Sequence, residues 1–280
     1  MKPVFRLGVI GQNIAYSKSA EIFKAVFDSI SAKGEFTIID IGPDQLADTL
    51  KRLKDERFNG FSVTIPHKQT VMSHLREIDP SAAEIGAVNS VRVSDDKLTG
   101  YNTDVHGFAL PLLTHKKLLS GRTAIILGNG GVARAAIYSL YHDFGVRSFL
   151  ICGRDSDRLD LFHQTIAPMF EGSTISLMTQ SDELAKSDYS LMVNCTPLGG
   201  FNHLDEIPFP AGNLEGRISI FYDLNYNMNN PLLDRARNSG MITIDGSVML
   251  VGQALRSFEI WTGQVAEFHR VYPVVFSDQS

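Results

Sequence analysis

The chain has 280 residues, of which 44% are hydrophobic, and its formal net charge at pH 7 is −5. A chain of this length and composition can bury a sizeable core and is long enough for two domains, which excludes an intrinsically disordered protein. The acidic balance, without any basic stripe, argues against nucleic acid or an anionic membrane as the main partner.

The sequence also bears on the compartment in which the protein works. No apolar run approaches the roughly 20 residues of a membrane-spanning helix, and the apolar piece Leu7–Ile10 is too short for a signal peptide. The two cysteines, Cys152 and Cys195, each end an apolar strand pattern, so we expect them to be buried, reduced thiols. Together these features predict a cytoplasmic protein.

The apolar pattern predicts an α/β unit in the first hundred residues. Short runs rich in β-branched residues indicate strands, whereas the apolar residues between Ile22 and Ile30 repeat at helical spacing. Pro66 is expected at the first position of a further helix, a place that suits proline. The predicted order is strand 4–10, helix 22–30, strand 36–41, helix 43–54, strand 60–65, and a hairpin of strands 87–93 and 97–101.

The next unit begins with the strongest motif of the chain. Strand 124–127 runs directly into Gly128-Asn-Gly130-Gly-Val-Ala133, and a helical pattern and a second strand at 147–152 follow. Strand, glycine turn, helix and strand within about 30 residues is the fingerprint of dinucleotide binding, here in its G-x-G-x-x-A form. The pyrophosphate then lies at the helix N-terminus, where unbonded N–H groups and the helix dipole favour an anion.

Further elements complete a two-domain α/β architecture. We expect residues 1–104, completed by 247–280, to form a substrate-binding and catalytic domain, and 105–246 to form a Rossmann-type, doubly wound dinucleotide-binding domain. A cleft between the two domains is expected. The remaining predicted elements are helix 105–113, helix 156–168, strands 174–178, 189–194 and 218–224, helix 247–263 and a final helical segment at 264–270.

Lys68 and Asp104 are the first candidates for chemistry. Lys68 follows Pro66 by two residues, so the predicted helix places its ammonium in a first turn, where the positive end of the helix dipole favours release of a proton. It is therefore either a proton donor or an ordinary solvated lysine. Asp104 precedes helix 105–113 and either caps that helix or holds the ammonium of Lys68.

Several polar residues at element ends are candidates for substrate binding. Ser17 and Ser19 either cap the first helix or offer two hydroxyls to a small carboxylate. Thr64 and Asn89 lie near strand ends. Gln253 follows Met249 by four residues on helix 247–263, so both occupy one helix face.

The residues after strand 147–152 bear on cofactor choice. An acid at this place favours NAD, whereas an arginine accommodates the 2′-phosphate of NADP. Arg154 and Arg158 make NADP the better choice, and Asp155 keeps NAD open. No metal site is predicted, because no histidine pairs with another histidine or a cysteine at a spacing of four.

In their order along the chain, these segments resemble the shikimate dehydrogenase family over nearly the whole sequence, from about Gly8 to Gly263. The combination of a lysine motif and an aspartate motif in this order is the most specific part of the resemblance. The matching segments are 8–11 with Ser17 and Ser19, Gly60-Phe-Ser-Val-Thr-Ile-Pro-His-Lys68, Gly86–Asn89, Gly100-Tyr-Asn-Thr-Asp104, the Gly128 turn, Asn194-Cys-Thr196, Asp223-Leu-Asn-Tyr226 and Gly246–Gln253.

The resemblance implies a role for each matching position. Lys68 and Asp104 form the catalytic pair, and Ser17 and Ser19 bind the substrate carboxylate. Other polar residues contact the ring hydroxyls or the reacting oxygen: Thr64, Asn89, Tyr226 and Gln253. The dinucleotide is held by Gly128, Asn129, Gly130, Gly131, Val132, Arg154, Arg158, Thr196, Leu224, Gly246 and Met249.

The implied activity is the reversible NADP-dependent reduction of 3-dehydroshikimate to shikimate in aromatic amino acid (chorismate) biosynthesis. The resemblance also implies that the partner is a small-molecule substrate and that the protein is a monomer or a homodimer. Residues that differ from the common family pattern, such as Tyr16 and Ser62, keep a quinate or aminoshikimate dehydrogenase open. Gly153 and Asp155, which flank Arg154, keep NAD open. A non-catalytic ligand sensor on the same fold and a folate-type dehydrogenase also stay open.

Overall fold

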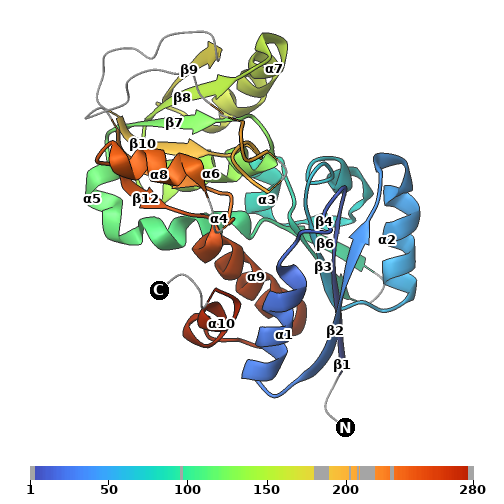
Figure 1. Ribbon diagram of the computed structural model, residues 1–280. Helices are drawn as coiled ribbons and strands as arrows, with labels where there is room; N and C mark the ends of the chain where they lie inside the picture. Colours follow the sequence, from blue (N-terminus) through green and yellow to red (C-terminus); the bar gives the residue numbers. More distant parts are fainter. Residues whose placement is uncertain are drawn as a thin grey trace. The chain divides into compact units, whose positions relative to one another are not determined.

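The computed structural model describes residues 4–94, 97–179, 189–201, 203–206, 208, 218–227 and 230–276. The chain divides into two compact units (Figure 1). Unit 1 comprises Met1–Gly107 and Val251–Ser280, and unit 2 comprises Phe108–Leu250. The substrate-binding and dinucleotide-binding roles expected for the two parts remain predictions.

Unit 1 is built on a mixed six-stranded sheet in the order β2-β1-β3-β5-β6-β4. β1 pairs in parallel with β2 and β3, whereas β5 is antiparallel to both β3 and β6. The hairpin predicted from the sequence is therefore confirmed as β5 and β6. The strands are β1 (Val4–Gly11), β2 (Lys33–Asp40), β3 (Gly60–Val63), β4 (Glu77–Ile78), β5 (Ser90–Ser94) and β6 (Lys97–Tyr101).

Helices at both ends of the chain pack together in unit 1. The Phe258 ring on α9 lies 5.7 Å from that of Phe5 on β1, and the Trp261 ring lies 5.6 Å from that of Phe23 on α1. A Cβ at Gly60 would come within 2.2 Å of the Trp261 ring, so the indole packs directly on the backbone of β3. The C-terminal helices thus return to the first unit, as predicted.

The helical elements of unit 1 are short apart from α1, α2 and the end of α9. A separate buried cluster, which includes Leu50, Phe61 and Val91, packs α2 and the loops after β3 on the sheet. The elements are α1 (Ser19–Ser29), η1 (Pro43–Gln45), α2 (Leu46–Asp55), η2 (Thr70–His74), α3 (Pro80–Ile85), α4 (Asp104–Ala109), α9 (Ser247–Thr262) and α10 (Phe268–Val275).

Unit 2 contains a six-stranded sheet in the order β12-β11-β10-β7-β8-β9, and all of its strand pairs are parallel. Counted along the chain from β7, this is the doubly wound order of dinucleotide-binding folds. The strand order reverses between β7 and β10, so ligands are expected beyond the carboxyl ends of those two strands. The strands are β7 (Thr123–Leu127), β8 (Ser148–Gly153), β9 (Thr174–Thr179), β10 (Tyr189–Asn194), β11 (Ile218–Asp223) and β12 (Ile242–Ile244).

Both faces of this sheet are covered, which explains why its strands are apolar throughout. Alternate residues such as Ile126 and Val193 pack with α6 and α7, whereas Ile125 and Met192 pack with α8. The helical elements of unit 2 are η3 (Leu110–His115), α5 (Lys116–Leu119), α6 (Gly131–His142), α7 (Ser156–Ile166), η4 (Ala167–Met169) and α8 (Pro231–Asn238).

Several details differ from the sequence-based expectations. The helix expected at Pro66 is absent: residues 66–69 form a turn after a cis Ile65–Pro66 bond, and only the 3₁₀ helix η2 follows. The carbonyl of Lys68 accepts a hydrogen bond from Val88, so it is held by a neighbouring segment and not by a helical turn. The prediction that a helix dipole acts on Lys68 was therefore wrong.

Smaller differences lie at element ends. The final helix begins at Phe268 and not at 264, because Gly263, with a φ of 69°, ends α9 and residues 264–267 are not helical. The helix expected at 105–113 continues beyond Ala109 as the 3₁₀ helix η3. Cys152 is buried as expected, but Cys195 is only partly buried. The sequence did not predict β4, α3, α8 or β12.

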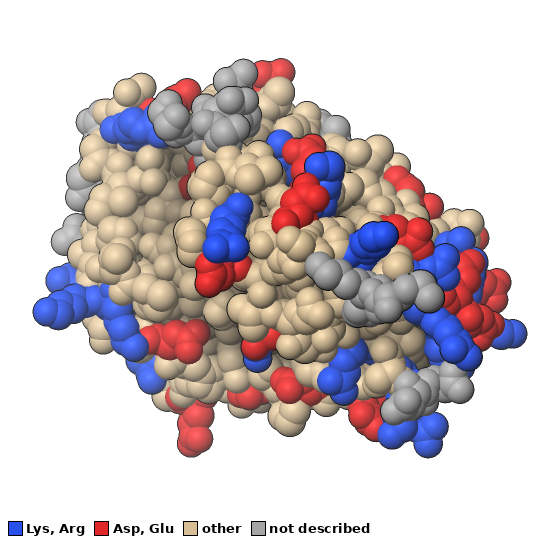
Figure 2. Space-filling model, turned by 90° about the horizontal axis from the view of Figure 1, so that it is seen from below, with Lys and Arg blue, Asp and Glu red and all other residues tan. Residues whose placement is uncertain are grey.

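The surface carries charges of both signs. On the face shown in Figure 2, Lys and Arg side chains are interspersed with Asp and Glu among uncharged residues. Within the described parts of the chain, no helix combines the length and the hydropathy needed to cross a membrane.

Candidate active site

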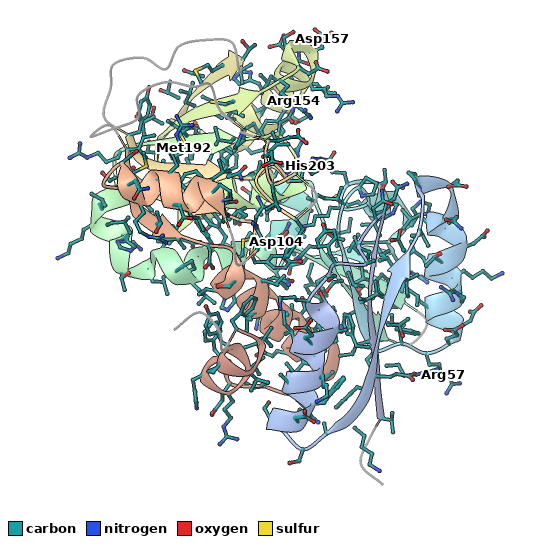
Figure 3. The ribbon with its side chains drawn as sticks, viewed as in Figure 1. Arg57, Asp104, Arg154, Asp157, Met192 and His203 are labelled. Atoms are coloured by element: carbon teal, nitrogen blue, oxygen red, sulfur yellow. The ribbon has the colours of Figure 1, made fainter. Side chains whose placement is uncertain are left out.

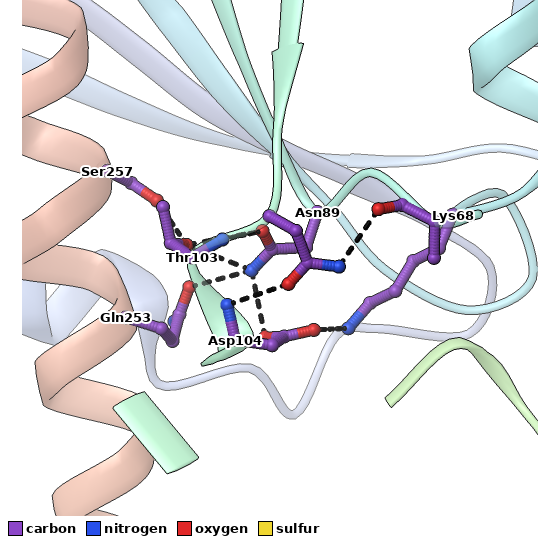
Figure 4. A network of polar contacts seen from close by, with 8 residues as sticks. Lys68, Asn89, Thr103, Asp104, Gln253 and Ser257 are labelled. Atoms are coloured by element: carbon purple, nitrogen blue, oxygen red, sulfur yellow. Dashed lines mark hydrogen bonds and ion pairs between the residues drawn. The ribbon is translucent and has the colours of Figure 1, made fainter. Parts of the chain in front are cut away.

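A buried ion pair lies at the centre of the candidate site in unit 1. The Nζ of Lys68 donates to Oδ2 of Asp104 at 2.5 Å, and the two side chains are only 14% and 7% exposed (Figure 4). Bringing two charges out of water is costly unless the remaining lone pairs and protons find partners. The surroundings of the pair therefore decide whether it is a stable arrangement.

The backbone around both members is fixed by hydrogen bonds. Lys68 lies in the turn after β3, and the N–H of Val88 donates to its carbonyl at 2.8 Å. Asp104 is the first residue of α4, and its N–H donates to Oδ1 of Asn102 at 3.1 Å. Asn102 in turn donates to the carbonyl of Ala87 at 2.9 Å. Both charged residues are thus tied to the segment that precedes β5.

Asn89 satisfies the second oxygen of the aspartate. Its Nδ2 donates to Oδ1 of Asp104 at 2.8 Å and lies 3.0 Å from Oγ1 of Thr103. Its Oδ1 accepts from the backbone N–H of Thr103 at 2.6 Å. Because the amide is held at both ends and is only 3% exposed, it fixes the carboxylate so that Oδ2 faces Lys68.

Helix α9 contributes the far side of this network. Oε1 of Gln253 lies 3.5 Å from Nδ2 of Asn89, and Oγ of Ser257 lies 2.9 Å from Oγ1 of Thr103. Figure 4 shows both helix residues facing the asparagine from one side, with Lys68 on the other. The structure therefore brings four of the predicted residues together: Lys68, Asn89, Asp104 and Gln253.

Three members of the network were not among the predicted site residues. Asn102 and Thr103 belong to the segment that was singled out for Asp104, but their side chains gave no separate signal. Ser257 follows Gln253 by four residues on an otherwise apolar helix face, and this spacing is a signal that could have identified it.

Ser17, which precedes α1, contacts Ser19, the first residue of that helix. Oγ of Ser17 accepts from the backbone N–H of Ser19 at 3.3 Å and donates to its Oγ at 3.0 Å. The first of these bonds is a local contact between a side chain and the backbone two residues on, and the N-cap of α1, Lys18, makes no side-chain capping bond. Thr64, which follows β3, is partly buried, and its carbonyl accepts from the N–H of His67.

The glycine turn of unit 2 fits a dinucleotide. Gly128 has a φ of 103°, a conformation that side-chain-bearing residues rarely adopt, and Gly130 is exposed, with open space where a Cβ would stand. Helix α6 begins at Gly131, so the first-turn N–H groups have no acceptor within the helix and suit a pyrophosphate. Asn129 and Val132, which flank the turn, are partly buried.

Other predicted cofactor residues surround this turn. A Cβ at Gly128 would lie 2.9 Å from Cγ2 of Thr196, so the turn and the loop after β10 are in contact. A Cβ at Gly246 would lie 2.1 Å from the carbonyl oxygen of Leu224, and only glycine allows this approach. Met249 is buried in the core of unit 2, and Tyr226 stacks edge-on against Phe201.

Of the two arginines expected near the adenosine end, Arg154 directly follows β8 (Figure 3), and Arg158 lies in the first turn of α7. Arg154 and Arg158 are exposed. Asp155 caps α7 by accepting from the backbone N–H of Arg158 at 3.1 Å, and its other oxygen lies 3.5 Å from Nε of Arg158. This carboxylate therefore already has partners within the chain, which weakens it as a reader of the NAD ribose.

Asp223, at the end of β11, is a second buried acid. It is 0% exposed, and burial raises its pKa from 3.8 to about 6, although hydrogen bonds from Asn230, Asn225 and Asn194 act in the opposite direction. Within the described residues, His, Cys, Asp and Glu form no group of three that could hold a metal ion.

Comparison with known proteins identifies the family. The model of the shikimate dehydrogenase substrate binding domain matches residues 9–91, and that of the shikimate 5′-dehydrogenase C-terminal domain matches residues 246–276. A relative from Chlorobaculum tepidum, named shikimate dehydrogenase (NADP(+)), is 38% identical over 266 residues, which cover 92% of this chain and 90% of the relative. This chain belongs to the shikimate dehydrogenase family.

Solved structures agree with the membership in the shikimate dehydrogenase family. A shikimate 5-dehydrogenase from Thermus thermophilus, in complex with NADP(H) and shikimate, has a TM-score of 0.83 and 26% identity and covers 97% of this chain and 98% of its own. A 5-ketofructose reductase of Gluconobacter has a TM-score of 0.84 and 27% identity and covers 99% of both chains. The predicted family and fold class are confirmed.

The buried acid of unit 2 generates a prediction about stability. The pKa of Asp223 in the folded protein, about 6, lies above its ordinary value of 3.8, so protonation favours the folded state. Its contribution to the free energy of unfolding should therefore rise as the pH falls through 6. Between pH 7.5 and 4.5, we expect wild type to gain about 2 kcal/mol relative to D223N in urea unfolding.

A matched control is the uncharged substitution S190A, which removes a buried hydroxyl from β10 that bonds to the carbonyl of Thr123. Its cost relative to wild type should be the same at both pH values. An equal difference between wild type and D223N at pH 7.5 and 4.5 would contradict the raised pKa.

Proposed function

We propose that this protein is an NADP-dependent shikimate dehydrogenase, an oxidoreductase that reversibly reduces 3-dehydroshikimate to shikimate in chorismate biosynthesis. The observation that carries the proposal is the buried contact between Lys68 and Asp104 in a chain of this family. The cofactor and the substrate are supported by the relative named shikimate dehydrogenase (NADP(+)) and by the Thermus thermophilus complex with NADP(H) and shikimate.

Lys68 supplies charge and a proton to the reacting oxygen. When bound, the reduced nicotinamide supplies the hydride to the keto carbon, and the oxygen then becomes negatively charged. The Lys68 ammonium stabilises this charge and donates the proton that completes the hydroxyl group. In the oxidation direction, the same amine takes up the hydroxyl proton.

Asp104 keeps the ammonium in place. Its Oδ2 accepts from Nζ of Lys68, while its Oδ1 is occupied by Asn89. A carboxylate fixed in this way holds a flexible lysine side chain in one position, which lowers the cost of orienting it for proton transfer. The same contact favours an enzyme over a ligand sensor, because a binding protein has no need of a positioned proton donor.

Substrate binding is assigned to polar groups without a net charge. Ser17 and Ser19 offer hydroxyl donors to the carboxylate of the ring, and Thr64, Tyr226 and Gln253 are proposed to contact its hydroxyls. Asn89 is already engaged with Thr103 and Asp104, so positioning the aspartate is its best-supported contribution.

The dinucleotide would be held by residues of unit 2. The Gly128–Val132 turn and the start of α6 fit the pyrophosphate, and Thr196, Leu224, Gly246 and Met249 are proposed for the nicotinamide side. Arg154 and Arg158 are proposed to bind the 2′-phosphate of NADP. The Asp155 side chain already accepts a hydrogen bond as the N-cap of α7, which is an argument against its binding the ribose of NAD and hence against NAD as the preferred cofactor.

Replacement of the lysine tests the proposed proton donor. K68M keeps the length of the side chain but removes the ammonium, so kcat for shikimate oxidation with NADP⁺ should fall roughly 10²–10⁴-fold, the usual range for loss of a general acid–base group. The matched control is K97M, because Lys97 forms a surface ion pair with Glu77 at 3.3 Å and its side chain is 46% exposed. Near-normal turnover of K68M in a folded protein would contradict the mechanism.

Replacement of an arginine tests the choice of cofactor. R154A should raise the KM for NADP⁺ about 10–100-fold, as expected for the loss of a hydrogen bond between charged groups, and should leave the KM for NAD⁺ unchanged. R235A, on the exposed side of α8, is the control. Initial rates with shikimate, quinate and 5-ketofructose, each with both cofactors, give the substrate preference. Equal effects of R154A on both cofactors would contradict the assignment.

A further inference from the structure

The carboxylate of Asp223 has no role in the chemistry proposed above, yet it is one of the most deeply buried charged groups of the described chain. It ends β11, directly before Leu224, and its exposed fraction is 0%. An acid in such a place is costly unless hydrogen bonds compensate for the lost water. The partners of this carboxylate therefore indicate why the residue stands there.

The carboxylate is surrounded by amide donors from three segments of unit 2. Oδ1 accepts from Nδ2 of Asn194 at 3.1 Å, and from the backbone N–H and Nδ2 of Asn225 at 3.0 and 2.9 Å. Oδ2 accepts from Nδ2 of Asn230 at 2.9 Å. The three asparagines come from the end of β10, from the segment after β11 and from the start of α8.

A carboxylate only accepts hydrogen bonds, so it fixes the orientation of each amide around it. With its NH₂ group facing Asp223, Asn194 directs Oδ1 to the N–H and hydroxyl of Thr196, at 3.0 and 2.7 Å. Asn230 directs Oδ1 to the N–H of Leu232 at 3.0 Å and thereby caps α8. An amide at position 223 would disturb this polarity, because one of its two groups is a donor.

The same amides tie down the loop that lies against the glycine turn. Nδ2 of Asn225 also donates to the carbonyls of Thr196 and Leu198, at 3.1 and 3.3 Å. Thr196 in turn contacts Gly128. On the other side, the carbonyl of Asn225 accepts from the N–H of Gly246 at 2.9 Å. Asp223 is thus linked to Thr196 through Asn194 and Asn225 and to Gly246 through Asn225, and Leu224 follows it directly in the chain.

We propose that Asp223 is the positioning residue for the nicotinamide half of the cofactor: through Asn194 and Asn225 it holds the Thr196–Leu198 loop and the Leu224 segment in the arrangement that binds this half. The inference rests on the proposed use of NADP and adds to it a residue that touches no part of the cofactor. The adenosine half depends on the α6 N-terminus and the arginines, which Asp223 does not contact within the described residues.

The proposal can be tested by comparing the binding of ligands with and without the nicotinamide half. Calorimetric titration of D223N should show a Kd for NADP⁺ about tenfold above that of wild type, because the loop is no longer held in place. The Kd for adenosine 2′,5′-bisphosphate, which lacks the nicotinamide, should change less than about twofold. N225A, which keeps the acid and the link through Asn194 but removes the link through Asn225 to Thr196, should give the same contrast to a smaller extent and remains informative if D223N does not fold.

S190A controls for a general loss of stability, because it removes a hydrogen bond from β10 outside the network and should leave both Kd values unchanged. Equal Kd values of D223N and wild type for NADP⁺, or an equal weakening for both ligands, would overturn the inference. Wild-type protein that binds NADP⁺ but oxidises no shikimate would instead contradict the proposed function and leave the positioning role intact.

Discussion

The contact between the Lys68 ammonium and the Asp104 carboxylate is the interaction on which the proposed chemistry depends. Both groups are largely removed from water, and such a pair is sustained only when every remaining oxygen and proton finds a partner. Asn89 meets this requirement for the aspartate, Thr103 holds Asn89, and the hydroxyl of Ser257 contacts that of Thr103. The network therefore stabilises a buried ion pair and holds the ammonium of Lys68 where a substrate can reach it.

Unit 2 also contains a buried carboxylate, but it is stabilised by different partners. Among the described residues its buried acid, Asp223, contacts amides and no cation, and these donors compensate for its charge only in part, so its pKa rises to about 6. The carboxylate is useful here because it accepts from several amides at once and so orders loops that come from different strands. Both units thus use an aspartate at a terminus of a secondary-structure element: Asp104 begins α4 and holds a cation, and Asp223 ends β11 and holds loops.

Much of the fold could be predicted from local patterns, but the contacts of the site could not. The Gly128 turn, its strand and its helix follow from neighbouring residues, and the parallel sheet follows from their repetition. The pairing of Lys68 with Asp104 joins residues 36 positions apart: their local patterns offered it only as one of two alternatives, and the family resemblance was needed to favour it. The helix expected at Pro66 was wrong because a bond to Val88, invisible in any local pattern, holds the turn. The ring of asparagines around Asp223 escaped prediction for the same reason, since its members lie on three separate segments.

The central claim is that the lysine and the aspartate act as one unit. A double-mutant cycle tests it most directly, with kcat for shikimate oxidation measured for K68M, D104N and the double variant. If two groups act as one unit, removal of either one already removes the contribution of the pair to kcat. The account therefore predicts that the double variant is no slower than the slower single variant. Losses that multiply, so that the double variant is slower than either single variant by the full effect of the other, would show that the two residues act independently and would contradict the account.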